Sequence, residues 1–118
     1  MPEKTIAQIF GTGASRLASG ATTSSSGLFI PDSVLISAGL ATPSTATAEG
    51  HLVAIVLQAK TVLTQTTFDT DIDQNIYVSS GFSSFTTRGT DNVTYRVDQL
   101  TFNLAKNDSG STLDPDNY

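Results

Sequence analysis

The stretch from residue 93 to residue 104, VTYRVDQLTFNL, carries the clearest structural signal in this chain. Apolar and polar residues alternate along it, which is the pattern of a β-strand with one covered face. The apolar residues occupy odd positions up to Val97 and even positions from Leu100 onward. A single strand would need a bulge at Asp98–Gln99 to absorb this change of phase. Otherwise the chain turns a corner there and passes into another sheet.

The segments that precede this stretch also predict strands. Ile76 and Val78 alternate with their neighbours, and residues 88–92 have the Gly, Asp and Asn content of a turn. Residues 28–40, LFIPDSVLISAGL, are typical of a strand, a turn and a second strand, because Pro31 readily starts a turn. Together these segments indicate a mainly β fold.

Residues 52–63 fit two structures. Apolar residues at spacings of three and four would form one helical face, made of Leu52, Ile55, Val56, Ala59 and Leu63. Thr45 or Thr47 would cap this helix, Glu49 suits its first turn and Lys60 its last. The β-branched run LVAIVL is also the right length for a strand, and periodicity does not choose between the two. We favour the helix, since the alanines around this run are good helix formers.

The sequence therefore predicts a mainly β fold, a small antiparallel sandwich-like domain with one short helix. We place this β-rich domain at residues 28–106, between an extended N-terminal arm at residues 1–27 and a polar C-terminal tail at residues 107–118. The arm is rich in Gly, Ser and Thr, which bury too little apolar area to offset the entropy lost on ordering.

The arm also contains the residues that we expect to bind a partner, which are Ile6, Ile9, Phe10 and Leu17. The first three have helical spacing and form a small apolar cluster. Two interpretations follow for residues 1–27. They form either a flexible leader or an arm that lies across a neighbouring subunit and is anchored there by this cluster.

Composition excludes several classes of protein. The chain of 118 residues has six Lys+Arg against eleven Asp+Glu, and its scattered cations form no basic patch, so we expect no nucleic-acid partner. No stretch approaches the ~20 apolar residues of a membrane-spanning helix, so we expect no membrane partner. The chain has no Cys, and His51 alone supports neither a metal site nor a catalytic triad unless a second chain contributes. We therefore expect no enzymatic activity and no cofactor.

Three carboxylates at alternate positions, Asp69, Asp71 and Asp73, resemble the start of a calcium-binding loop. Such a loop needs glycine where Gln74 stands and glutamate where Ser80 stands. We interpret this acidic cluster, defined as Asp69, Asp71 and Asp73, as a solvated loop, and calcium binding is the alternative.

Aromatic residues on the predicted strands allow a different function. Most of them are expected to pack in the core or across strands. An exposed subset would stack on sugar rings, and Phe82, Phe85 and Tyr95 are the candidates. The alternative function is therefore a glycan-binding or host-recognition module of a virion or cell surface.

Three stretches of the chain carry a resemblance to a known class. The Cys-free arm with GTGASRLASG, the strands of DNVTYRVDQLTFNL and the tail NDSGSTLDPDNY resemble small virion structural proteins of tailed bacteriophages. The resemblance implies a non-enzymatic subunit located in the virion, either a capsid decoration (cement) protein or a tail component. It implies oligomeric partners, namely further copies of the chain and the major capsid or tail proteins. Few charges and many hydroxyls, with 14 Ser and 18 Thr, suit contacts between subunits because little charge is desolvated there.

Overall fold

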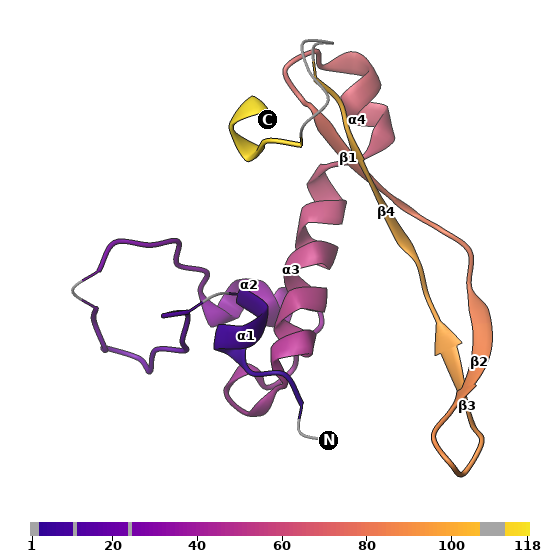
Figure 1. The fold of residues 1–118 in the computed structure, drawn as a ribbon. Helices are drawn as coiled ribbons and strands as arrows, with labels where there is room; N and C mark the ends of the chain where they lie inside the picture. The colour runs from indigo at the N-terminus through magenta and orange to yellow at the C-terminus, as the bar shows by residue number, and fades with distance from the viewer. Residues whose placement is uncertain (1–2, 11, 24, 107–112) are drawn as a thin grey trace. The chain divides into compact units, whose positions relative to one another are not determined.

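The structure is a computed structural model that describes residues 3–10, 12–23, 25–106 and 113–118. Within these residues, helices account for 35% and strands for 19%, and the strands form two separate two-stranded antiparallel sheets. Figure 1 shows the α-helices in the part of the chain before residue 71 and a long hairpin after it. The predicted mainly β sandwich is therefore wrong, because the chain is richer in helix than in strand and its sheets do not clearly form a sandwich.

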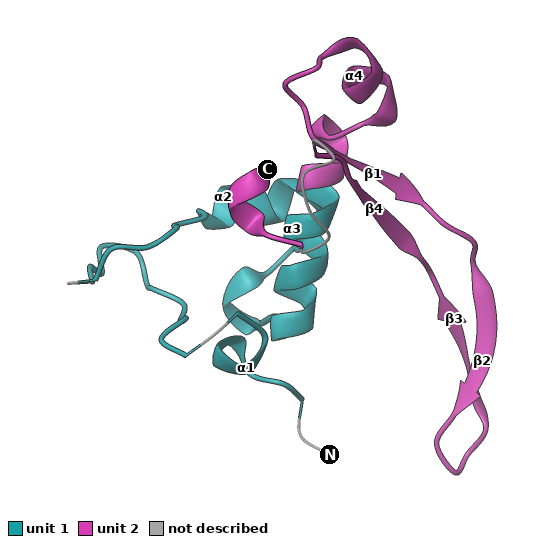
Figure 2. Cartoon of the chain, turned by 45° about the horizontal axis from the view of Figure 1, so that its top comes forward, with its two compact units in different colours: residues 1–58 teal, residues 59–118 magenta. Residues whose placement is uncertain are grey.

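The chain divides into two compact units, Met1–Gln58 and Ala59–Tyr118, which Figure 2 shows in teal and magenta. The division falls inside a helix, whereas the sequence suggested boundaries after residues 27 and 106. The predicted arm is thus part of the first unit. Residues 107–112 of the predicted tail lie outside the described residues, and the short 3-10 helix η2 (Pro115–Asn117) follows them.

The first unit begins with the short helix α1 (Ile6–Phe10). Thr5 and Gln8 cap it reciprocally: the Gln8 backbone N–H donates to Thr5 Oγ1 at 3.1 Å, and the Thr5 N–H donates to Gln8 Oε1 at 2.8 Å. This capping box satisfies two donors that a helix start leaves unpaired. The helical spacing of the apolar residues predicted for this segment is therefore realised in a helix.

Residues 28–40 contain the helix α2 (Asp32–Ser37), so the predicted strand–turn–strand is wrong. Pro31 is the N-cap and Asp32 lies in the first turn, where a carboxylate favours the helix dipole. The C-terminus closes as a Schellman motif, in which the Gly39 N–H donates to Ile36 O and the Leu40 N–H donates to Leu35 O. Gly39 has φ +113°, which other residues rarely adopt. The motif therefore explains why Ala38–Gly39 ends a helix and not a strand.

After the 3-10 turn η1 (Pro43–Thr45), the favoured helix is confirmed as α3 (Ala48–Val62). Thr47 caps it, since its Oγ1 accepts the Gly50 N–H at 3.0 Å. Glu49 and Lys60 lie in the first and last turns as predicted. The buried residues are Ala48, His51 and Ala54, whereas Leu52 of the predicted face is exposed. The covered side of α3 is therefore shifted from the apolar side that the periodicity indicated.

The second unit contains α4 (Gln65–Thr70) and four strands: β1 (Ile76–Ser80), β2 (Ser84–Arg88), β3 (Val93–Val97) and β4 (Leu100–Leu104). Its small core lies where α4 meets β1. The rings of Phe68 and Tyr77 lie 4.9 Å apart, and Val78 is 4% exposed. The Val78 N–H donates to Leu63 O at 2.9 Å and ties β1 to the residue after α3.

The four strands follow one long hairpin, with β2 and β3 at the end far from α4 (Figure 1). β1 pairs with β4 and β2 pairs with β3, so the chain changes sheet between Val97 and Leu100. The corner at Asp98–Gln99 is thus the alternative that the structure adopts. Gly81 crosses from β1 to β2 opposite this corner and its N–H donates to Gln99 O at 2.7 Å. A Cβ at Gly81 would lie 2.7 Å from Gln99 Cβ, so only glycine allows the two connections to approach this closely.

Candidate functional site

The β2–β3 ribbon, residues 84–88 and 93–97, is the most exposed regular structure in the second unit. All five residues of each strand are exposed. A lone two-stranded ribbon is marginally stable in water, because neither face is packed on a core. The ribbon is therefore a surface that gains stability when another molecule covers it.

The pairing register assigns each side chain to one of the two faces of the ribbon. Tyr95 is opposite Thr86, and Phe85 is opposite Arg96. Opposed residues in an antiparallel pair share a face, and neighbours along a strand alternate. One face therefore carries three apolar residues of β3, and we name it the β3 face: Val93, Tyr95 and Val97. The Arg88 guanidinium lies 5.3 Å from the centre of the Tyr95 ring on this face, a cation–π contact.

A polar network joins the two connections at the base of the ribbon. Asp98 Oδ1 accepts from Ser83 Oγ and from Arg96 Nε, each at 2.8 Å. Arg96 Nη2 also donates to Ser83 Oγ at 3.1 Å. These hydrogen bonds, first from Arg96 and then from Ser83, hold the pKa of the Asp98 carboxyl below its usual value, against a small opposing effect of desolvation. The network links β3 to the segment before β2 and orients the ribbon's first residues.

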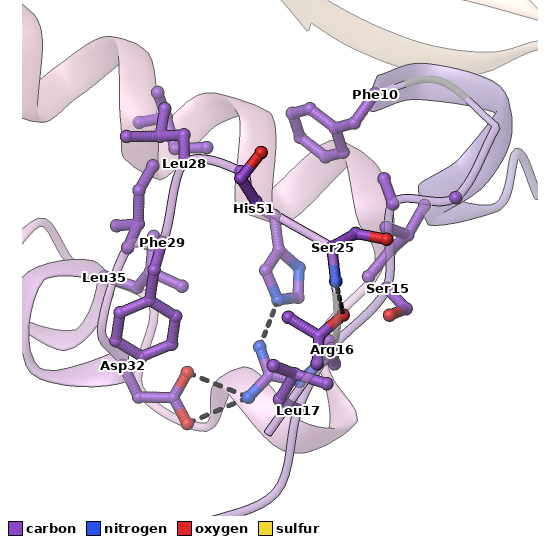
Figure 3. Close-up of a pocket in the computed structure, with 18 residues that line it drawn as sticks. Phe10, Ser15, Arg16, Leu17, Ser25, Leu28, Phe29, Asp32, Leu35 and His51 are labelled. Carbon is purple, nitrogen blue, oxygen red and sulfur yellow. Dashed lines mark hydrogen bonds and ion pairs between the residues drawn. The ribbon is translucent and has the colours of Figure 1, made fainter. Parts of the chain in front are cut away.

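In the first unit, Arg16 connects the irregular segment after α1 to α2 and α3 (Figure 3). Its Nη2 donates to both carboxylate oxygens of Asp32 at 2.8 Å, and its Nη1 lies 2.7 Å from His51 Nε2. His51 Nδ1 lies 2.7 Å from the backbone oxygen of Thr47, an atom that only accepts. His51 therefore donates from Nδ1 and accepts from Arg16 at Nε2, which defines the neutral Nδ1–H tautomer. We name Arg16, Asp32 and His51 the arginine clasp.

The clasp borders an open cavity of about 880 Å³ within the first unit (Figure 3). Apolar side chains make up much of its lining, among them Phe29, Ile30, Leu35 and Ile55. Both nitrogens of His51 already have partners, and Asp32 already binds Arg16. The clasp therefore holds the segment in place and presents no unpaired histidine nitrogen to a bound molecule.

The structure places the four predicted partner-binding residues of the arm near the cavity or on α1. Ile6, Phe10 and Leu17 line the cavity, and Ile9 is half-buried on α1. Ile6 is half-buried too, while Phe10 and Leu17 are exposed at their outer sides. These residues contribute to the first unit itself, so their binding to a neighbour stays a prediction.

The three predicted glycan-binding residues are all exposed, with exposed fractions of 87% for Phe82, 72% for Phe85 and 43% for Tyr95. The register places Phe85 and Tyr95 on opposite faces of the ribbon, and Phe82 lies in the connection between β1 and β2. Phe85 and Tyr95 therefore do not line one common groove.

The acidic cluster lies on the end of α4 and the turn that follows. Asp69 is in the helix, Asp71 is the residue after its last turn, and all three carboxylates are exposed. Asp71 Oδ1 accepts the Asp73 N–H at 2.9 Å, an Asx turn. Throughout the part of the chain that the structure describes, no group of three or more His, Asp or Glu residues is placed to hold a metal ion.

Sequence reasoning missed the arginine clasp and the network around Asp98. The sequence alone does not indicate that His51 is buried, and it is 5% exposed. Its partner Arg16 is 35 residues away, a separation at which no local pattern exists. Asp98 lies in the predicted bulge or corner, whereas its partner Ser83 is 15 residues away and carries no sequence signal.

Comparison of the chain with protein families, with curated proteins and with solved structures found no match. Among the described residues, the structure also has no helix with the length and apolar character that crossing a membrane requires.

Proposed function

We propose that this chain is a non-enzymatic structural subunit of a phage virion, joined to neighbouring subunits through the β2–β3 ribbon. The observation that carries the proposal is the exposure of every residue in both strands of the ribbon. The partners are further copies of the chain and other virion proteins, such as the major capsid or tail proteins. The virion setting rests on the resemblance of the sequence to small phage structural proteins.

The exposed area of the chain supports a role in assembly. The chain of 12.4 kDa exposes 9277 Å². Two separate compact units of half this mass would together expose about 7,400 Å² by the usual scaling of area with mass. The excess of roughly 1,900 Å² is more than twice the ~800 Å² that one partner contributes to a standard interface. Contacts with neighbours would cover this excess.

The distribution of the apolar residues also supports a role in assembly. Few large apolar side chains are buried, and Leu35 and Val78 are the largest of them in the described residues. Aromatic and aliphatic residues are instead exposed along the ribbon, including Phe85, Tyr95 and Val97. Aromatic residues and arginines, such as Tyr95 with Arg88 beside its ring, are enriched in interface cores. The chain therefore keeps much of its apolar area for contacts that a neighbour completes.

The test measures how much of the chain is present in purified phage particles by quantitative mass spectrometry. The test variant replaces Val93, Tyr95 and Val97 by threonine, which keeps the β propensity of the strand but removes the apolar face. The control variant combines Thr87→Ser with Thr94→Ser on the opposite face of the same ribbon.

We expect the test variant to be depleted about tenfold or more, which corresponds to ~1.4 kcal/mol of lost contact energy. The control variant should be incorporated as the wild type is. Far-ultraviolet circular dichroism must show intact helices in both variants. Full incorporation of the test variant would contradict the role of the ribbon, and absence of the wild-type chain from particles would contradict the virion role itself.

A further inference from the structure

The outer edge of β3 is open to pairing. In the described residues β3 pairs with β2 alone, so one row of its backbone N–H and C=O groups has no strand beside it. Natural edge strands discourage such pairing with lysine, proline or a bulge. The sequence of β3, VTYRV, contains neither lysine nor proline. Its one charged residue, Arg96, pairs with Asp98 at 2.8 Å, and the other four residues favour strands.

This edge is complementary to itself. If two copies of β3 run antiparallel about a two-fold axis at Tyr95, Tyr95 lies opposite Tyr95 of the second copy. Val93 then lies opposite Val97 of the second copy, and Thr94 lies opposite Arg96 of the second copy. All apolar pairs fall on one face, and no two like charges are opposed. Aromatic and β-branched pairs of this kind each add about 0.2–1 kcal/mol to strand pairing.

The edge of β2 offers a poorer match. The same antiparallel arrangement about Thr86 would place Ser84 opposite Arg88 of the second copy and Phe85 opposite Thr87 of the second copy. The first pair joins two polar residues and the second joins an aromatic to a polar residue, so no pair joins two apolar residues. The comparison of the two edges therefore favours β3.

We propose that β3 pairs edge to edge with β3 of a second copy of this chain, forming a four-stranded sheet in the order β2–β3–β3–β2. This inference rests on the proposed function, because it takes the ribbon as the contact surface and names its partner. The roughly 1,900 Å² of excess exposed area allows this contact in addition to others. Such an isologous contact gives a closed dimer that serves as a building block.

Two single-cysteine variants of the full chain test the pairing. The chain has no native Cys, so any disulfide must involve the introduced thiol. Tyr95→Cys places a thiol at the two-fold axis, where opposed Cα atoms lie about 4.5–5.5 Å apart, within disulfide reach. Thr86→Cys is the matched control, because Thr86 is opposite Tyr95 on the same face of the same ribbon. In the proposed sheet its two copies are three strand spacings apart, about 14 Å.

Under mild oxidation we expect Tyr95→Cys to form disulfide-linked dimers about tenfold faster than Thr86→Cys, since only the first pair meets disulfide geometry. Faster linkage of Thr86→Cys would overturn the proposal in favour of the β2 edge. Slow linkage of both would overturn it in favour of a different protein as partner, and equal fast linkage would overturn it in favour of random collision.

A second pair of variants leaves Tyr95 intact, in case its ring is needed for folding. Val93→Cys and Val97→Cys should link to each other when the two are mixed, but neither should link to itself, because identical positions are about 13 Å apart. Linkage in each separate sample would overturn the proposed register. The particle assay is independent of this result: a chain present in particles, with a required ribbon but no β3 linkage, contradicts this inference alone.

Discussion

Replacing Arg16 by alanine should destabilise the first unit far more than replacing Asp32, although the two residues form one ion pair. The Asp32 side chain is 51% exposed, so the pair belongs to the surface class that contributes about 0–1 kcal/mol. His51 is 5% exposed, and its Nε2 accepts from Arg16. Loss of Arg16 leaves this buried acceptor without its partner, which costs about 1–3 kcal/mol.

The free energy of unfolding is measured by urea denaturation of the full chain, followed by far-ultraviolet circular dichroism. This signal reports on α3, whereas tyrosine fluorescence reports on the second unit, because Tyr77, Tyr95 and Tyr118 all lie there and the chain has no Trp. We expect Arg16→Ala to lower the free energy of unfolding by about 2 kcal/mol and Asp32→Ala to lower it by less than about 1 kcal/mol.

A His51→Leu background serves as the control for this comparison. There the buried acceptor is already gone, so Arg16→Ala should cost no more than the surface pair, about 0–1 kcal/mol. Equal losses for Arg16→Ala and Asp32→Ala in the wild-type background would refute the reasoning. So would an undiminished loss for Arg16→Ala in the His51→Leu background.

Four further predictions concern the second unit. The folded state holds the pKa of Asp98 below its unfolded value, so the stability that Asp98 adds to the ribbon is complete above about pH 4 and is lost as the pH falls through the lowered pKa. Asp98→Asn should remove this pH dependence from the amide exchange rates of the ribbon, and an unchanged pH dependence in this variant would contradict the prediction. Val78→Ala should lower the free energy of unfolding by about 2 kcal/mol, because a side chain that is 4% exposed loses its packing; a loss below 0.5 kcal/mol in denaturation curves, roughly the scale of surface changes, would contradict its core position. Gly81→Ala should lower the free energy of unfolding by about 1–3 kcal/mol, since the added Cβ would lie 2.7 Å from Gln99 Cβ. An unaltered melting temperature would contradict this, because the corner would then accommodate the Cβ without loss of stability. Calcium titration should leave the melting temperature of the chain unchanged, since the carboxylates of the acidic cluster are exposed and one is used in an Asx turn; an upward shift would restore the calcium alternative.

Local signals predicted the strands of the second unit and the helix α3. The change of apolar phase between Val97 and Leu100 predicted either a bulge or a corner, and the structure has the corner. The helix favoured for residues 52–63 is α3, and its cap at Thr47 was among the two candidates. These features depend on residues that are close in the sequence, so a single sequence is enough to predict them.

Three other features differ from the sequence prediction, and each has a physical reason. In residues 28–40, Pro31 suggests a turn, although Pro before Asp and Gly after an apolar run also start and end a helix. The covered side of α3 depends on Arg16, which reaches His51 from 35 residues away. The sandwich failed for a related reason, because the strands along the hairpin pair with each other and leave both ribbon faces exposed.

Hydrogen–deuterium exchange tests most directly whether neighbouring subunits cover the β2–β3 ribbon. Hydrogen–deuterium exchange of residues 84–97 should be compared between the dilute free chain and purified phage particles, with α3 as the internal reference. We predict that exchange in the ribbon slows about tenfold or more in particles, since paired and covered amides exchange through rarer openings. Equal exchange of the ribbon in both samples would contradict it.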